Sequence, residues 1–245
     1  MPDPELSPLR DLVVLITGAS SGIGRALAVD LARHGAPLGL AGRRPDALAD
    51  TAALLPAGSR SGSFPVDLTD DDQARTLVRK VETEFGRLDV VVHCAATYHQ
   101  GPLETTSVDA LDDQYRTNVR APYVLTQAAL PLLKRAKGQI VFVNSTTGLV
   151  ARPFVTGYAA SKHALKGLAD SLRHELADHG VRVISVYPGQ TATPMQAKRY
   201  AFEERPYEPA KLIQPEDVAT MIRTVIALPR TADVTDVQVR PGLRS

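Results

Sequence analysis

Tyr158 and Lys162 stand four residues apart in the stretch Tyr-Ala-Ala-Ser-Lys, and their side chains are of the types that transfer protons. Apolar periodicity predicts a helix over 157–179, and residues four apart in a helix share one face. A phenol has an ordinary pKa of about 10, which makes it a poor acid or base near neutral pH. A neighbouring ammonium favours the phenolate, so the spacing predicts a tyrosine that its lysine tunes for acid–base chemistry.

Coulomb's law gives the expected size of this tuning. Two charges roughly 4 Å apart interact by about 4 kcal/mol at an effective dielectric constant near 20. Because one pKa unit corresponds to about 1.36 kcal/mol, we expect Lys162 to lower the pKa of Tyr158 by roughly three units, to near neutrality. The same spacing also occurs in ordinary solvated helix pairs, so the surrounding elements must decide between the two interpretations.

The elements around the pair alternate regularly along the chain. Short β-branched runs predict strands, several of them almost continuously apolar, as expected of a parallel sheet covered on both faces. Strict alternation with helices predicts one α/β domain, a Rossmann-type doubly wound parallel sheet of about seven strands flanked by helices. The strands are expected at 12–16, 37–41, 61–66, 88–93, 139–144, 181–187 and 234–239, and the helices at 22–34, 45–55, 70–85, 108–136, 157–179 and 215–228.

Composition narrows the function classes. The 245 residues are 44% hydrophobic and 22% charged, with a net charge of +1, which provides no basic field for nucleic acid. No apolar run reaches the roughly 18 residues of a membrane span, and the N-terminus is unlike a signal peptide. Cys94 is the only cysteine, and the six histidines form no metal-ligand grouping. We therefore expect a cytoplasmic protein without a metal, a nucleic-acid partner or a membrane partner, with residues 1–10 as a flexible extension of a domain over 11–245.

A glycine-rich turn follows the first predicted strand. Thr17–Gly24 reads Thr-Gly-Ala-Ser-Ser-Gly-Ile-Gly and leads directly into a helix. Glycines at such a place permit a sharp turn and close approach to a pyrophosphate, and the helix N-terminus offers free N–H groups to the anion. The spacing differs from GxGxxG and no Gly-Lys-Ser/Thr follows, so a triphosphate P-loop is disfavoured and a dinucleotide site is favoured over a bare turn.

The end of the second predicted strand bears on which dinucleotide binds. Arg43 and Arg44 follow Gly42 there, with no carboxylate before Asp46. An acidic residue at this place bonds a ribose 2′-hydroxyl, whereas a guanidinium pairs with a 2′-phosphate and stacks on adenine. The alternative, two solvated arginines, is less favourable beside a helix N-terminus. The prediction is NADP(H) in preference to NAD(H).

The segment from Gln190 to Pro215 breaks the alternation of strands and helices. It is rich in proline and carries Met195 and three aromatic residues between charged ones. It leaves the sixth strand at the edge where open α/β sheets bind ligands, which favours a substrate lid near 190–215, with a short helix, over a passive surface excursion.

Together these residues resemble the short-chain dehydrogenase/reductase family, over nearly the whole chain from about Leu12 to Pro241, and within it an NADP-preferring subgroup. The motifs are Thr17–Gly24, Asp67 in Val-Asp-Leu, Asn118 in Thr-Asn-Val, Ser145, the Tyr158/Lys162 pair, and Pro188-Gly189 with Thr193. Their order and spacing are specific as a set, although each alone is modest.

The resemblance implies roles for the matching residues. Tyr158 would be the general acid/base, and Lys162 would lower its pKa and bind the nicotinamide ribose. Ser145 would hydrogen-bond the substrate oxygen, and Asn118 would hold a water of the proton relay, although Ser145 could instead cap a strand end and Asn118 bond to backbone. The implied cofactor-binding residues are Gly18, Ser20, Ser21, Gly22, Ile23, Gly24, Arg43, Arg44, Asp67, Ala95, Asn118, Tyr158, Lys162, Pro188, Gly189, Thr191 and Thr193.

Some residues fit the family pattern less well. Thr191 stands where the family has valine or isoleucine, and Asp67 could cap the helix that starts near Asp70 instead of meeting adenine. His93-Cys94-Ala95-Ala96 replaces the family's Asn-Asn-Ala-Gly, so we expect local rewiring, a buried, inert Cys94 and no catalytic role for His93.

The leading hypothesis is an NADP(H)-dependent oxidoreductase that reduces a carbonyl, or oxidises the matching alcohol, of a small organic substrate. The alternative is a catalytically silent NADP(H)-sensing regulator of the same fold, which would not need Tyr158. The long helices at 108–136 and 157–179 resemble the family's subunit interface and imply a homodimer or homotetramer. Candidate substrate contacts are Thr147, Leu149, Arg152, Phe154 and Met195.

Overall fold

A seven-stranded parallel sheet organises the molecule, as the sequence predicts. The computed structural model describes residues 7–242. All seven predicted strands are present within about two residues of the expected positions, in the spatial order β3-β2-β1-β4-β5-β6-β7. The strands are β1 Val14–Thr17, β2 Leu38–Gly42, β3 Ser61–Pro65, β4 Val90–His93, β5 Gln139–Val143, β6 Arg182–Pro188 and β7 Asp236–Val239.

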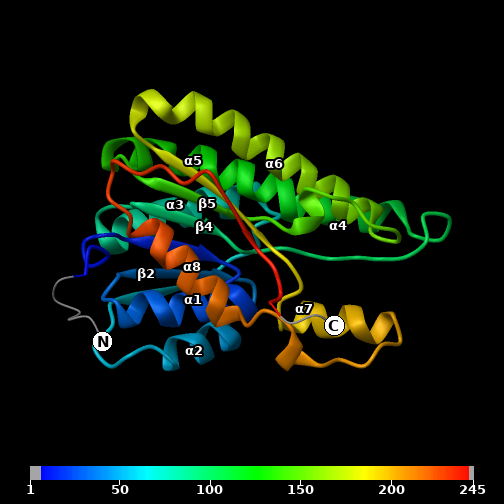
Figure 1. Ribbon diagram of the computed structural model, residues 1–245. Coiled ribbons are helices and arrows are strands. Elements are labelled where there is room, and N and C mark those ends of the chain that lie inside the picture. The colour runs from blue at the N-terminus through cyan, green and yellow to red at the C-terminus, as the bar shows by residue number, and fades with distance from the viewer. Residues whose placement is uncertain (1–6, 243–245) are drawn as a thin grey trace.

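Helices cover both faces of this sheet (Figure 1). Every residue of β1, β2, β4 and β5 is buried, which explains why these strands are apolar without alternation. The α-helices are α1 Gly22–Arg33, α2 Pro45–Ala53, α3 Asp71–Phe85, α4 Val108–Tyr115, α5 Ala121–Ala136, α6 Thr156–Leu176, α7 Pro194–Phe202 and α8 Pro215–Ile226.

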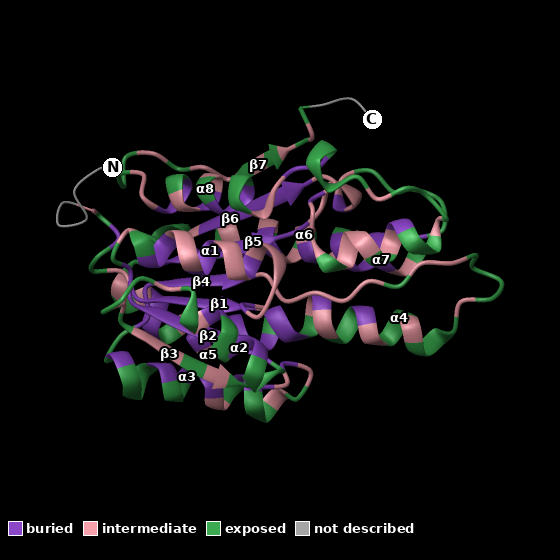
Figure 2. Ribbon diagram, turned by 90° about the horizontal axis from the view of Figure 1, so that it is seen from below, coloured by how far each residue is buried: buried purple, intermediate pink, exposed green. Residues whose placement is uncertain are grey.

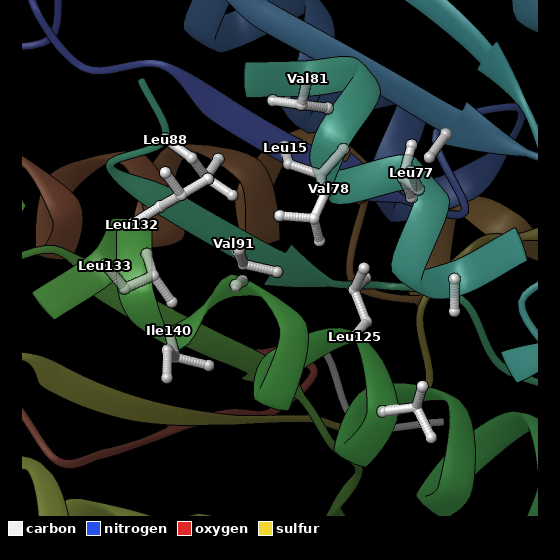
Figure 3. Packing of buried hydrophobic residues seen from close by; sticks show 14 of the residues in the cluster. Leu15, Leu77, Val78, Val81, Leu88, Val91, Leu125, Leu132, Leu133 and Ile140 are labelled. Atoms are coloured by element: carbon white, nitrogen blue, oxygen red, sulfur yellow. The ribbon is translucent and has the colours of Figure 1, made fainter. Parts of the chain in front are cut away.

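The apolar core forms two layers, one on each side of the sheet. On one side, Leu15 and Val91 of the sheet pack against Val78 of α3 and Leu125 of α5 (Figure 3). On the other side, α1 and α8 lie against the sheet and against each other. Figure 2 shows the buried surface running along the strands, with exposed residues on the outer faces of the helices. The sheet is therefore a rigid platform whose edges and loops remain available for ligands.

Two local features differ from the sequence-based expectations. The helix predicted over 108–136 is interrupted by a π-helical turn, η2 Arg116–Arg120, which contains Asn118. In the predicted flexible extension, Leu9 is only 1% exposed and belongs to the core layer of α1 and α8. Residues 7–10 are therefore anchored, because burial of Leu9 fixes them. Residues 1–6 of that predicted extension lie outside the described part of the chain.

The carboxyl ends of the strands mark the functional edge. Strand order reverses between β1 and β4, which pair directly, so the chain leaves them toward opposite sides and opens a crevice there. Both ribbon views place α4 and α7 at this end of the molecule (Figures 1 and 2). Between residues 7 and 242, no helix has the combined length and apolarity that a membrane span requires.

Candidate active site and cofactor site

The glycine-rich turn between β1 and α1 has a backbone that only glycine accommodates easily. Gly18 and Gly22 have left-handed φ values of 66° and 53°. At Gly24, an added Cβ would stand 2.4 Å from the carbonyl oxygen of Gly18. The turn and the first helical turn therefore pack backbone to backbone, which brings the helix N-terminus close to the strand end.

Two polar residues that sequence reasoning missed hold this turn in place. The Thr51 hydroxyl, from α2, lies 3.0 Å from the carbonyl oxygens of both Ala19 and Ala47 and accepts a 3.1 Å hydrogen bond from Nε of Arg25. Nη2 of Arg25 donates to the Ser20 carbonyl over 2.7 Å. Because Thr51 is fully buried and far along the chain from the turn, no local pattern indicated this role.

The start of α1 fits a bound pyrophosphate. Ser21 is the N-cap residue, and its side chain makes no capping hydrogen bond. The first N–H groups of the helix thus remain available, together with the positive end of the helix dipole. Added to the close glycine packing, this is the cradle that a dinucleotide needs, and the residues present fit that cofactor.

The residues predicted for the adenosine part lie beside this cradle. Arg43 and Arg44 are exposed directly after β2, and neither side chain forms a hydrogen bond or ion pair with a residue in the described part of the chain. An added Cβ at Gly42 would stand 3.5 Å from Oγ of Ser20, so strand end and turn are adjacent. Asp67 accepts hydrogen bonds from the backbone N–H and hydroxyl of Thr69 and does not cap α3. Asp70 performs that capping.

The segment His93-Cys94-Ala95-Ala96 is rewired through Thr17. The hydroxyl oxygen of Thr17 accepts hydrogen bonds from the backbone N–H groups of Cys94 and Ala95 at 3.1 and 3.2 Å, and it lies 3.4 Å from the Val92 carbonyl oxygen. A Cβ at Gly18 would meet the Ala95 nitrogen at 2.8 Å, so β1 and β4 end in direct contact. The strands are thereby tied together by a side chain from β1.

The two unusual side chains of this segment have no catalytic geometry. His93 is 3% exposed, stacks on Phe142 with ring centroids 4.9 Å apart, and has Nε2 2.9 Å from the Thr126 hydroxyl. Burial lowers the pKa of His93 to about 3, so the ring is neutral. Cys94 is partly buried, and desolvation raises the pKa of its thiol to about 12, while the charge of Lys162 opposes that rise. Both groups are inert at neutral pH.

Tyr158 and Ser145 lie in the wall of one cavity of about 120 Å³ at the carboxyl edge of the sheet. Tyr158 comes from the first turn of α6, and Ser145 from the loop directly after β5. Tyr98 packs edge-on against Tyr158 with ring centroids 4.8 Å apart. The Ser145 hydroxyl accepts from the backbone N–H of Thr147 at 3.1 Å, which leaves its own proton for the Tyr158 hydroxyl or for a ligand oxygen. Two hydroxyls can therefore serve one ligand oxygen.

Lys162 lies behind Tyr158 in the protein interior. Its side chain is buried, and Nζ donates to the Val143 carbonyl over 3.0 Å. Nζ stands 5.8 Å from the centre of the Tyr158 ring. The pair shares a helix face as predicted, but the ammonium is aimed at the end of β5.

The predicted lowering of the Tyr158 pKa is wrong for the protein alone. Burial raises the pKa of Tyr158 to about 12, although a hydrogen bond with Ser145 opposes that rise. Burial also lowers the pKa of Lys162 to about 8. The cause is desolvation, which disfavours the charged form of both groups. Spacing alone did not reveal that both side chains are almost completely enclosed.

Two asparagines organise the frame around these residues. Asn118 accepts from the Thr97 N–H, and its Nδ2 donates to the Thr97 carbonyl and to the Ser161 hydroxyl at 3.0 and 3.1 Å. Its amide is thus bonded mainly to backbone, the alternative noted from the sequence, and it does not line the cavity. Asn144 donates to the Lys162 carbonyl and accepts from the Ser145 N–H. Sequence reasoning missed Asn144, which fixes Ser145 relative to α6.

The cavity includes only part of the predicted substrate set. Thr147, Arg152 and Met195 line it, whereas Leu149 and Phe154 do not. Phe154 is 60% exposed, and its backbone has a left-handed φ of 64° in the loop before α6. Of the predicted cofactor residues, Ile23, Tyr158, Pro188, Gly189, Thr191 and Thr193 contribute to the lining. Sequence reasoning missed Gln190, Gln196 and Arg199; the last two follow Met195 on the predicted short helix, where the spacing of four from Met195 to Arg199 was the available signal.

The base of α7 contacts the glycine-rich turn. Thr193 is the N-cap of α7 and accepts from the Gln196 N–H at 3.3 Å. A Cβ at Gly22 would stand 3.1 Å from Cγ2 of Thr193. The cofactor cradle and the predicted lid helix are therefore neighbours.

Comparisons with known proteins agree with this architecture. The chain is 31% identical over 239 residues to an uncharacterized oxidoreductase of Staphylococcus aureus (strain USA300), covering 96% of this chain and all of that protein. An alcohol dehydrogenase from the archaeon Thermococcus sibiricus, solved with 5-hydroxy-NADP, superposes with a TM-score of 0.87 at 27% identity, covering 96% of this chain and 98% of that one. Levodione reductase superposes with a TM-score of 0.88 at 25% identity over the same shares.

A further relative is a much longer protein than this chain. The chain is 33% identical to glycine betaine reductase of Emericella nidulans over 240 residues, which are 96% of this chain and 19% of that protein. The sequence model of the short chain dehydrogenase family matches residues 12–204, a span that contains the glycine-rich turn, Ser145, Tyr158 and Lys162. The chain belongs to the short chain dehydrogenase family of oxidoreductases.

Proposed function

We propose that the protein is an NADP(H)-dependent oxidoreductase that reduces the carbonyl of a small organic substrate, or oxidises the corresponding alcohol. The observation that carries this proposal is the convergence of the Tyr158 and Ser145 hydroxyls on one cavity that also reaches Ile23 beside the glycine-rich turn. Two proton donors next to a dinucleotide cradle are what carbonyl reduction requires.

The chemistry divides between the chain and its cofactor. When bound, the nicotinamide cofactor supplies the hydride. Ser145 donates a hydrogen bond to the substrate oxygen and stabilises the negative charge that develops there. Tyr158, with its proton retained by burial, delivers that proton to the oxygen as general acid. Lys162 completes the proposed catalytic group through the cofactor ribose. Asn118 is proposed to hold a relay water from its backbone, because its side-chain amide is already bonded to Thr97 and Ser161.

Turnover of a carbonyl panel tests the reaction. Purified wild-type protein should consume NADPH with a subset of aldehydes, ketones and diketones, followed at the absorbance of the reduced nicotinamide. Tyr158→Phe should keep NADPH binding and lose about 100-fold or more in kcat, as general acid–base catalysis contributes 10²–10⁴-fold. Should both proteins bind NADPH and neither turn over any compound, the regulator hypothesis would replace this proposal.

The preference for NADP(H) over NAD(H) is proposed on Arg43 and Arg44. Both guanidinium groups are exposed beside Gly42, where a 2′-phosphate would have room. The NADP ligand named for the Thermococcus enzyme gives this preference independent support. Arg43→Asp should weaken NADPH binding at least about tenfold more than NADH binding, since a bidentate phosphate contact is replaced by repulsion. Equal weakening of the two would remove the basis for the preference.

The remaining proposals concern setting and assembly. We place the protein in the cytoplasm, with residues 11–245 as the catalytic domain and 190–215 as its substrate lid. A homodimer or homotetramer through the outer faces of α4, α5 and α6 is supported by half-exposed apolar side chains there, Leu111, Tyr115 and Tyr123. Light scattering after size exclusion would give the subunit number, and a monomer at micromolar concentration would contradict this assembly.

A further inference from the structure

The charged residues that line the cavity of Tyr158 and Ser145 all carry positive charge. Its lining contains two arginines, Arg152 and Arg199, and no aspartate or glutamate. The whole chain, by contrast, carries 28 basic and 27 acidic side chains. A cavity with only positive side chains in a nearly neutral protein selects the charge of what enters it.

Both arginines retain unused hydrogen-bonding capacity. Arg152 is exposed and forms no hydrogen bond or ion pair with any residue between 7 and 242. Arg199 donates through Nε to Glu203 at 2.7 Å, while its two Nη groups have no partner among the same residues. Glu203 also binds Arg205, so one carboxylate is shared between two guanidinium groups. Glu203 thus orients Arg199, and its single negative charge leaves the group of Arg152, Arg199 and Arg205 positive.

A third group in the same wall lacks a partner. Gln196 precedes Arg199 by three residues on α7, and its Nε2 is buried without a hydrogen bond to any described residue. Buried polar groups in folded proteins are paired as a rule, so an unpaired one in a cavity wall indicates a ligand atom. Residues three apart on a helix share a face, so Gln196 and Arg199 can reach one bound group together.

The positive charge acts at the reactive end of the cavity. Burial raises the pKa of Tyr98 to about 12, and the charges of Arg199 and Arg152 both oppose that rise, while Glu203 adds to it. Arg199 also opposes the raised pKa of Tyr158, after the larger effects of burial, Ser145 and Tyr98. Arg199 therefore lies within electrostatic range of both tyrosine hydroxyls, and Arg152 within range of that of Tyr98.

We infer that the substrate is an anion: a small carbonyl compound whose oxyanion group, carboxylate or phosphate, is bound by Arg199, Arg152 and Gln196 while Ser145 and Tyr158 hold its carbonyl oxygen. The second half of this statement rests on the proposed function. A guanidinium fork matches the paired oxygens of a carboxylate or phosphate, and the amide of Gln196 adds a further hydrogen bond to the same group. The substrate would then be held at two points, which fixes its carbonyl against the two hydroxyls.

Matched substrates of different charge test the inference. Straight-chain oxo acids with the ketone at positions 2 to 5 are compared with their methyl esters, and dihydroxyacetone phosphate with dihydroxyacetone. The best acid or the phosphate should exceed its neutral partner in kcat/KM by about tenfold or more, as expected for hydrogen bonds to a charged group. Preference for the acid identifies a carboxylate, and preference for the phosphate identifies a phosphoryl group.

Variants on α7, the helix of the proposed lid, test whether Arg199 causes the preference for anions. Arg199→Met should reduce the ratio of kcat/KM for the acid to that for its ester, or for the phosphate to that for its neutral partner, about tenfold, mainly by raising KM for the anion. Arg199→Lys should restore part of that ratio. Lys198→Met is the matched control, because Lys198 is exposed on the same helix and does not line the cavity. It should leave the ratio unchanged. Titration with NADPH, followed by its own fluorescence, should give the same Kd for wild type and Arg199→Met.

The outcomes separate this inference from the proposed function. The anion site would be overturned, and the reductase left intact, by either of two results. One is equal kcat/KM for neutral carbonyls and for anions in the wild type, and the other is an Arg199→Met variant whose kcat/KM falls equally for both. Weakened NADPH binding in Arg199→Met would assign the arginine to the cofactor and also overturn the inference. No turnover of any compound, neutral or charged, would instead remove the proposed function and the anion site with it.

Discussion

The two ends of the reactive crevice are built in opposite ways. At the cofactor end, the site is a shape of the backbone, set by Gly18, Gly22 and Gly24 and secured by the buried hydrogen bonds of Thr51. At the substrate end, the site is a set of side chains on α7 and the loop before α6, several without a partner in residues 7–242. At the first end the chain's own contacts fix the shape and leave backbone N–H groups of α1 for a ligand, whereas the second end leaves side-chain groups for a ligand to satisfy.

This difference indicates where the same contacts serve both the stability of the fold and the binding of a ligand. Replacing a group at the cofactor end should harm the fold and binding together, because the same contacts serve both. Replacing an unpaired group at the substrate end should cost activity and spare the fold, because folding gains nothing from it. Three substitutions test this division, in order of decreasing expected effect.

Gly24→Ala should have the largest effect. Its Cβ would stand 2.4 Å from the Gly18 carbonyl oxygen, so the turn must open and the helix N-terminus move away from the strand. We expect loss of about 100-fold or more in NADPH affinity and a cost of about 2 kcal/mol or more in unfolding free energy, the range of overpacking.

Gly167→Ala provides the control for this change. Gly167 is an exposed residue of α6, and an added Cβ would meet no atom within 4 Å. Unchanged NADPH binding and a gain of up to about 1 kcal/mol are expected there. Fluorescence titration and urea unfolding measure both quantities. Wild-type affinity in Gly24→Ala would refute the view that backbone shape defines the cofactor end.

Lys162→Met tests the group that stands between the two ends. The pKa of Lys162 is lowered to about 8 from 10.5 by burial, so its charged form costs the folded state about 3 kcal/mol below pH 8. Loss of the hydrogen bond to Val143 offsets about 1 kcal/mol of this cost. At pH 7 the inactive variant should therefore be more stable by about 2 kcal/mol.

The pH dependence of Lys162→Met gives a second measure. Between about pH 8 and 10.5 the unfolded wild type binds the proton that the folded protein has released, so wild-type stability should rise with pH across this window. The variant lacks this group and should lose its advantage there. Thermal unfolding at pH 7 and pH 10 is the measurement, and a variant less stable than wild type at pH 7 would contradict the cost assigned to the buried ammonium.

Gln196→Leu should have the smallest effect and the opposite sign from a change at the cofactor end. Its Nε2 is buried without a partner, so an apolar side chain of similar size should raise the unfolding free energy by about 1 kcal/mol. Thr51→Val is the matched comparison, since it removes a hydroxyl with three partners and should cost about 1–3 kcal/mol. Stability losses of equal size in both variants would abolish the distinction between the two ends.

The fold could be predicted from the sequence because its determinants are local and repeated. Seven apolar runs with intervening helical patterns predicted the sheet, and the covered faces explain why the runs do not alternate. The π-helical turn at Asn118 could not be predicted, since it arises where the amide bonds to Thr97, a residue 21 positions earlier.

The site was predictable in its residue types and less so in its energetics. The spacing of Tyr158 and Lys162 indicated a shared face, but the direction of Nζ toward Val143 depends on how α6 packs on β5. Likewise, Arg199 enters the cavity and Phe154 leaves it because of backbone directions in α7 and in the loop before α6. Such directions follow from packing between elements and leave no local pattern in the sequence.

The contact between Gly22 and Thr193 couples substitutions at the cofactor end to substitutions at the substrate end. Only 3.1 Å separates Cγ2 of Thr193 from the point that a Cβ at position 22 would occupy. Serine at position 193 would remove that methyl group and keep the hydroxyl that caps α7. Position 22 also has a left-handed φ of 53°, which asparagine tolerates better than most side chains. Among relatives, asparagine at position 22 is therefore expected to appear together with a smaller residue at position 193, so that a change in the cofactor turn is accompanied by a change at the base of the substrate lid.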